Sequence, residues 1–124
     1  RFRFFRKKLE RSGIEFLLSD RYLYDSVINL EYLSLDKTSS PQKYFASIAA
    51  LIPRPDIAFY LRITPEEILK RDRVPEQGIE YLRKKFTLIE QKKSDWHLIE
   101  IDASHEKDSV FSDISLNILN ILSI

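Results

Sequence analysis

Three apolar segments, each too short for an ordinary helix and each ending in a polar residue or followed directly by one, constrain the fold of this chain most. They are residues 15–20 (EFLLSD), 56–63 (DIAFYLRI) and 98–102 (LIEID). Short apolar runs of this kind are typical of strands that are buried on both faces, as in a parallel sheet. The segments between them have helical periodicity instead. The sequence therefore predicts strands that alternate with helices.

Apolar residues recur at helical spacing in the remaining segments. Phe2, Phe5 and Leu9 predict an opening helix that ends near Gly13, where a helix cap is expected. Further helices are predicted over 22–35, from Pro41 to Pro53, after Thr64, over 79–89 and over 110–121. Thr64-Pro65-Glu66-Glu67 has the capping-box pattern of a helix start.

The connections between the strands determine the fold class and the place of a site. Hairpin turn signals are absent, so we predict an α/β fold in which helices flank a parallel sheet with right-handed crossovers. Ligands of such sheets bind beyond the carboxyl ends of the strands. Polar residues stand at all three of these ends: Asp20-Arg21, Thr64 and Asp102-Ala103-Ser104. A ligand site is expected there.

Composition excludes several classes of function. The 20 basic and 19 acidic side chains nearly cancel, so nucleic acid and anionic membranes are not expected partners. The chain has no cysteine, which suits a reducing compartment and predicts a cytoplasmic protein. His97 and His105 lack the spacing of zinc ligands. A small, locally recognised ligand fits this composition better.

Asp20 and Arg21 are the first candidates for chemistry. An acid at a strand end can hold magnesium whose remaining oxygens come from bound phosphates. The planar fork of an adjacent arginine suits a phosphate better than a lysine does. The alternative interpretation is that Asp20 caps the helix near Tyr22 and that Arg21 is solvated.

Taken in order, these motifs resemble the thymidylate kinase family of P-loop kinases. The family has a DRY-like motif at a strand end, a Pro-Asp strand leading to Pro-Glu, an arginine-rich lid and a closing IDA strand followed by Ser or Thr. Here they stand as Asp20-Arg21-Tyr22, Pro55-Asp56 with the strand to Leu61, Pro65-Glu66, Lys70-Arg71 and Ile101-Asp102-Ala103-Ser104. The resemblance implies a three-layer α/β/α domain, incomplete at its amino terminus, of which residues 1–124 form the carboxy-terminal part.

The resemblance also implies a function and an acceptor site. The reaction would be ATP-dependent phosphorylation of a nucleoside monophosphate, dTMP to dTDP, with Mg²⁺, by a cytoplasmic homodimer. Asp20 would organise the metal and the reacting end of the acceptor, and Arg21 would bind the acceptor phosphate. Tyr22, Ser26 and Asn29 would complete the substrate side. Asn29 stands where the family has an aromatic residue against the deoxyribose, so sugar and base specificity stay open.

On the ATP side, the resemblance places Arg71 at the base of a short lid near residues 71–78, against the adenine or the phosphates. Arg73 would stabilise charge on the transferring phosphoryl group. The backbone of Ala103 and Ser104 would border the adenine. The alternative interpretation of Arg71 and Arg73 is a solvated helix end, where basic side chains meet the helix dipole favourably.

The sequence departs from the family in its glycines. Gly13 and Gly78 are the two glycines, and no G-x-x-x-x-G-K-S/T phosphate loop occurs. We therefore expect an upstream part whose strand lies between residues 16–18 and 57–61. Two rival hypotheses remain: a related P-loop kinase that acts on another nucleotide or a deoxynucleoside, and a non-catalytic α/β module that keeps the kinase scaffold.

Overall fold

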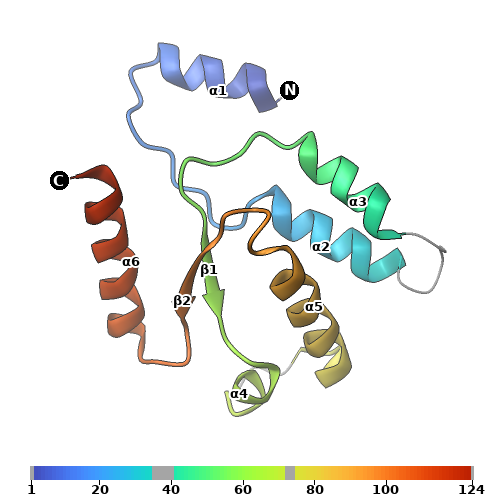
Figure 1. The fold of residues 1–124 in the computed structure, drawn as a ribbon. Helices are drawn as coiled ribbons and strands as arrows, with labels where there is room; N and C mark the ends of the chain where they lie inside the picture. The colour runs from blue at the N-terminus through green and yellow to red at the C-terminus, as the bar shows by residue number, and fades with distance from the viewer. Residues whose placement is uncertain (1, 35–40, 72–74, 124) are drawn as a thin grey trace. The chain divides into compact units, whose positions relative to one another are not determined.

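The computed structural model describes residues 2–34, 41–71 and 75–123 (Figure 1). The chain divides into two compact units, Arg1–Arg54 and Pro55–Ile124. In the described residues, no helix is both long and apolar enough to cross a membrane. The first unit is helical and the second contains the sheet, so the chain combines helices with a parallel strand pair, which is compatible with the predicted α/β class.

The first unit contains α1 (Phe2–Arg11), α2 (Leu23–Ser34) and α3 (Pro41–Ala50). The predicted glycine cap of α1 is confirmed: Gly13 has a φ of +71°, and its N–H donates to the Glu10 carbonyl at 3.3 Å. Helix α2 packs on α3 and supplies most of this unit's core, which consists of the buried residues Tyr24, Val27, Ile28 and Phe45.

The segment between α1 and α2 is not a strand, so the prediction of a strand over residues 15–20 is wrong for this structure. Phe16, Leu17 and Leu18 are 69, 62 and 94% exposed. A strand needs a neighbour that pairs with its backbone N–H and carbonyl groups. The sheet in the described part of the chain consists of β1 and β2 and gives this apolar run no partner.

The second unit is built on one crossover between two parallel strands. Strand β1 (Phe59–Arg62) leads through α4 (Pro65–Leu69) and α5 (Gly78–Lys92) to β2 (Ile99–Asp102), and α6 (Lys107–Leu122) follows. Phe59 pairs with Ile99 and Arg62 with Asp102, so the prediction of parallel strands is confirmed for these two segments. Both strands are shorter than the sequence pattern indicates.

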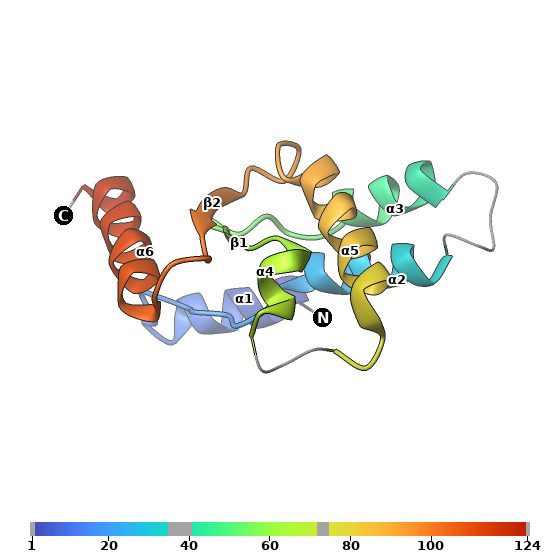
Figure 2. The ribbon, with the colours of Figure 1, turned by 90° about the horizontal axis from the view of Figure 1, so that it is seen from below.

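The register gives the strand pair one polar and one apolar face. Tyr60 and Arg62 share a face with Glu100 and Asp102, while Phe59, Leu61, Ile99 and Ile101 occupy the other. In both views the strands lie between α5 and α6 (Figures 1 and 2). Side chains of α5 contact the polar face, and α6 contacts β2.

Candidate functional site

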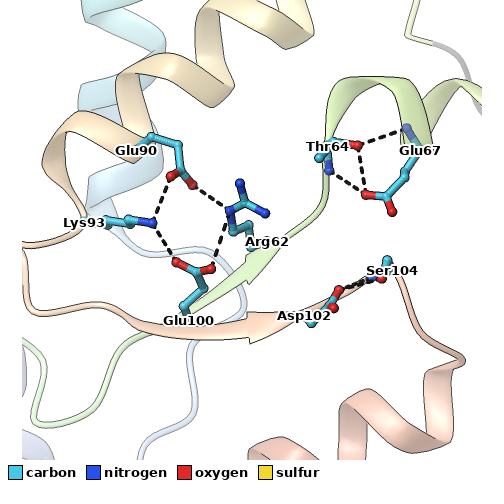
Figure 3. A network of polar contacts seen from close by, with 8 residues as sticks. All are labelled: Arg62, Thr64, Glu67, Glu90, Lys93, Glu100, Asp102 and Ser104. Atoms are coloured by element: carbon cyan, nitrogen blue, oxygen red, sulfur yellow. Dashed lines mark hydrogen bonds and ion pairs between the residues drawn. The ribbon is translucent and has the colours of Figure 1, made fainter.

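The carboxyl end of β1 runs directly into the capped start of α4. The Thr64 hydroxyl accepts a hydrogen bond from the Glu67 N–H at 3.3 Å, and the Glu67 carboxylate accepts one from the Thr64 N–H at 3.0 Å. The two side chains also bond to each other at 2.8 Å (Figure 3). The predicted capping box is therefore confirmed. The bonds from the Thr64 backbone and hydroxyl lower the pKa of Glu67.

The carboxyl end of β2 forms a tight polar turn. Asp102 Oδ1 accepts hydrogen bonds from the Ser104 N–H at 2.9 Å and from the Ser104 hydroxyl at 2.6 Å (Figure 3). These two bonds, the hydroxyl first, lower the pKa of the Asp102 carboxyl. His105 Nε2 lies 3.7 Å from the other carboxylate oxygen. The turn is ordered by its own side chains and leaves the Ala103 carbonyl available to an outside donor.

That donor is Arg71. Its Nη2 donates a hydrogen bond of 2.6 Å to the Ala103 carbonyl, 32 positions away in the sequence. Two residues that the sequence assigns to the ATP side therefore meet at the carboxyl ends of β1 and β2, and Ser104 is adjacent. The alternative interpretation, in which Arg71 is a solvated side chain at a helix end, is incomplete. The guanidinium is exposed, but the Ala103 carbonyl from a distant turn fixes it. Arg73 lies outside the described residues.

Four charged residues that sequence reasoning missed form a network between α5 and the polar face of the strand pair (Figure 3). Arg62 Nε lies 3.0 Å from Glu90 and 3.5 Å from Glu100, and Lys93 Nζ lies 2.8 and 2.7 Å from the same two carboxylates. The Arg62 guanidinium also stacks over the Phe86 ring at 5.0 Å. The available signal was the i, i+3 spacing of Glu90, in α5, and Lys93, which caps the carboxyl end of that helix.

The network shifts the pKa of Glu90 and of the neighbouring Tyr60. The hydrogen bond from Lys93, and then the one from Arg62, lower the pKa of Glu90 despite its partial burial. Burial, followed by the charge of Glu90, raises the pKa of the buried Tyr60 hydroxyl. Each base is shared between two acids, so the cluster connects β1, β2 and α5 through ion pairs. These ion pairs join the polar face of the strand pair to α5 and its carboxyl end.

In the first unit, the predicted acceptor-side residues gather on the turn before α2. Asp20 and Arg21 are both exposed, and Arg21 has a φ of +62°, in the left-handed region. The Ser19 hydroxyl donates to the Arg21 carbonyl at 3.0 Å. The Tyr22 hydroxyl donates to the Pro53 carbonyl, and its ring lies edge-on to Tyr24. Asp20 does not follow a strand, contrary to the expectation.

The remaining acceptor-side residues lie on the first turns of α2. Ser26 is exposed, and Asn29 is partly buried. The Asn29 amide donates to the Asp25 carboxylate at 3.4 Å, one turn earlier on the helix. Asn29 therefore has a helix-surface partner, while its carbonyl oxygen keeps its acceptor capacity.

The implied magnesium calls for oxygen ligands such as the carboxylates of the described residues. Across the described ranges, no group of three or more His, Cys, Asp or Glu residues could hold a metal ion. Magnesium bound with a nucleotide keeps several waters and phosphate oxygens, and needs only one or two protein carboxylates. Asp20 has an exposed carboxylate of the kind that would complete such a ligand set. The donor set fits magnesium brought by a nucleotide better than a site made by the protein alone.

Comparison with known proteins gives one relationship. The chain is 30% identical over 97 residues to "Probable thymidylate kinase" from Sulfurisphaera tokodaii, an alignment that covers 72% of this chain. The relationship to a kinase is distant. The alignment covers 47% of the relative, so the chain spans about half of that protein's length. No family model and no solved structure matches the chain.

Proposed function

We propose that this chain is the carboxy-terminal part of an ATP-dependent nucleoside-monophosphate kinase, with dTMP as the acceptor. The observation that carries the proposal is the bond from Arg71 to the Ala103 carbonyl at the carboxyl ends of two parallel strands. Ligands of parallel sheets bind at this end. The similarity to a protein named as a thymidylate kinase supports the nucleotide-kinase class.

Arg71 suits the nucleotide donor. A guanidinium carries five N–H donors in one plane, and the bond to Ala103 uses one group and fixes the orientation of that plane. The remaining donors and the flat face are then directed without further ordering, which favours binding of a planar base or an anionic phosphate. The Ala103–Ser104 turn supplies backbone polar groups beside it.

Arg21 and Asp20 suit the acceptor. Both side chains are exposed on one turn, where the Arg21 fork can bind two phosphate oxygens through charge-assisted hydrogen bonds. Asp20 would hold magnesium that arrives with ATP, and the metal would neutralise phosphate charge. The two residues would align the acceptor phosphate for direct in-line transfer, which depends on positioning and electrostatic stabilisation.

The phosphate loop is assigned to an upstream part of the protein. These 124 residues contain no glycine-rich phosphate cradle, and they span about half of their relative. Residues 1–124 would supply the turn of Asp20 and Arg21 for the acceptor, the base of the lid at Arg71, and the Ala103–Ser104 turn beside the adenine. The upstream part would supply the strand and loop that hold the donor phosphates. The cytoplasmic location and the homodimer remain predictions of this proposal.

A substrate panel tests the proposal. The full-length protein is incubated with ATP, Mg²⁺ and each of dTMP, dUMP, UMP, dCMP and thymidine, and ADP release is measured. We expect turnover to be greatest with dTMP. The Asn29→Tyr variant should discriminate more strongly against UMP, because an aromatic ring replaces an amide that can bond to a 2′-hydroxyl. Turnover of thymidine alone would identify a nucleoside kinase, and no turnover would favour the non-catalytic module.

A further inference from the structure

The Arg21 backbone adopts a conformation that arginine seldom takes. With a φ of +62°, it belongs to the left-handed region, where the Cβ atom of an L-residue crowds its own backbone. Glycine avoids this strain, but an arginine stands here. Strained residues persist when the surrounding structure over-determines them, and they concentrate at functional sites. The contacts on either side of Arg21, which keep it in this conformation, therefore require a functional explanation.

Two side-chain hydroxyls hold the turn. Ser19 donates to the Arg21 carbonyl at 3.0 Å and fixes the orientation of the peptide that follows Arg21. Tyr22, the next residue, donates to the Pro53 carbonyl, 31 positions away in the segment after α3. The Tyr22 carbonyl also accepts from the Asp25 N–H at 3.0 Å, which ties the turn to the start of α2.

The Tyr22 side chain is committed to the protein. Its ring centroid lies 5.4 Å from that of the buried Tyr24, at an interplanar angle of 79°. Burial, the largest cause, raises the pKa of Tyr22, so the hydroxyl keeps its proton and can donate throughout the neutral range. A hydroxyl that already donates to Pro53 is poorly placed to donate to a substrate as well.

We propose that Tyr22 is a positioning residue: together with Ser19 it holds Arg21 in the left-handed conformation that directs its guanidinium at an anionic ligand. The identification of this ligand as the acceptor phosphate rests on the proposed function. The claim that Tyr22 and Ser19 hold the strained turn does not depend on it. A guanidinium aimed by its backbone loses less conformational freedom on binding than one on a relaxed loop. Tyr22 thereby acts through Arg21 and does not contact the substrate.

A thermal double-mutant cycle tests the holding role independently of any activity. It uses the full-length wild type, Arg21→Gly, Tyr22→Phe and the double variant. Arg21→Gly should raise Tm by about 2 °C, because glycine removes the strain. In the Tyr22→Phe background, Arg21→Gly should raise Tm by less than half as much, because the turn released by the loss of the Tyr22 hydroxyl has already relaxed. Equal gains in both backgrounds, or no gain in the wild type, would overturn the proposal.

Steady-state kinetics tests the positioning of Arg21. Tyr22→Phe should raise the KM for dTMP about five- to tenfold, with kcat changed less than twofold and the KM for ATP unchanged; Ser19→Ala should act in the same direction. Tyr32→Phe, which removes a hydroxyl from a later turn of α2, is the control. Equal changes in both KM values would indicate a merely structural role and overturn the proposal. If the wild type phosphorylates no acceptor, the proposed function fails, and the thermal cycle still decides whether Tyr22 holds the turn.

Discussion

Arg71 shows how a single side chain can be fixed without being buried. It is exposed, yet its bond to Ala103 crosses from the segment after α4 to the turn after β2. A guanidinium bonded to a carbonyl retains its full charge and most of its donors. The side chain is therefore ordered before any ligand arrives, which distinguishes it from the exposed arginines of surface ion pairs.

Replacing Arg71 should affect the nucleotide donor selectively. We expect Arg71→Ala to raise the KM for ATP about tenfold, because a fixed charge-assisted donor is lost, and to leave the KM for the acceptor nearly unchanged. Arg71→Lys should rescue little, because lysine lacks the planar fork. The control is Arg83→Ala, since Arg83 pairs with Glu66 and Glu80 on the surface. A similar loss in the Arg83 variant, or full rescue by lysine, would contradict the assignment.

At the scale of elements, short strands and a short helix are held at their ends by polar contacts. Helix α4 has only five residues, too few to be stable alone, and its capping box satisfies backbone groups at its start. The four-charge network performs a comparable task for β1, β2 and α5. The capping box stands at the carboxyl end of β1, on the proposed ATP side, whereas Lys93 and Glu100 of the network lie toward the amino end of β2 (Figure 3).

Removing the cap of α4 should destabilise the protein. Thr64→Ala loses the oxygen that accepts the Glu67 N–H, and we expect the free energy of unfolding to fall by about 1 kcal/mol. Thr64→Ser should retain most of the stability. Thr87→Ala removes a similar hydroxyl from the exposed side of α5, where it donates to the Arg83 carbonyl, and should be nearly neutral. Urea unfolding of the three variants checks this; equal losses for Thr64→Ala and Thr87→Ala would refute it.

The charge network predicts a pH dependence. Because Lys93 and Arg62 lower the pKa of Glu90 below its ordinary value of 4.5, its stabilising contribution is complete above that pH and is lost as the pH falls through the folded-state pKa. Glu90→Gln should therefore lower Tm by about 2–4 °C at pH 7 and by much less at pH 3. Glu80→Gln, on the same helix but 71% exposed, should change Tm little at either pH. If the difference in Tm between wild type and Glu90→Gln were the same at pH 7 and pH 3, the role of the network would be contradicted.

Sequence patterns predicted some of these features and missed others for physical reasons. The capping box is local, so four consecutive residues suffice to predict it. The meeting of Arg71 and Ala103 follows from topology, since the carboxyl ends of parallel strands share one edge. The Arg62 network depends on strand register, which no local pattern contains. The strand over residues 15–20 failed because an apolar run becomes a strand only beside a partner.

At the scale of the whole molecule, the described chain exposes much apolar surface. Parallel sheets are ordinarily covered on both faces and contain several strands, whereas β1 and β2 form a pair. The large exposed apolar side chains include Phe16, Leu18, Leu61, Phe111 and Leu116. Under the proposed function, these side chains would be covered by the upstream part that supplies the phosphate loop.

The effect of Leu18→Ala should therefore depend on the length of the protein. In the 124-residue polypeptide, where Leu18 is 94% exposed, the substitution should change the free energy of unfolding by less than about 0.5 kcal/mol. In the full-length protein, burial by the upstream part should raise the cost to about 2–3 kcal/mol. Ile28→Ala, in the core, is the control and should be costly in both. Equal small effects of Leu18→Ala would show that the upstream part does not cover this segment.

The long crossover between the paired strands also determines the order in which they are made. Phe59 pairs with Ile99, so β1 leaves the ribosome roughly 40 residues before its partner, a delay of about 2–8 s at ordinary elongation rates. During that interval the backbone edges of β1 await β2, and nascent chains with such edges are prone to associate. The strand is four residues long and ends in Arg62, whose charge opposes association until Glu90 and Glu100 have been synthesised. The charge of Arg62, which later pairs with Glu90 and Glu100, is therefore expected to oppose association of the chain while it is being translated.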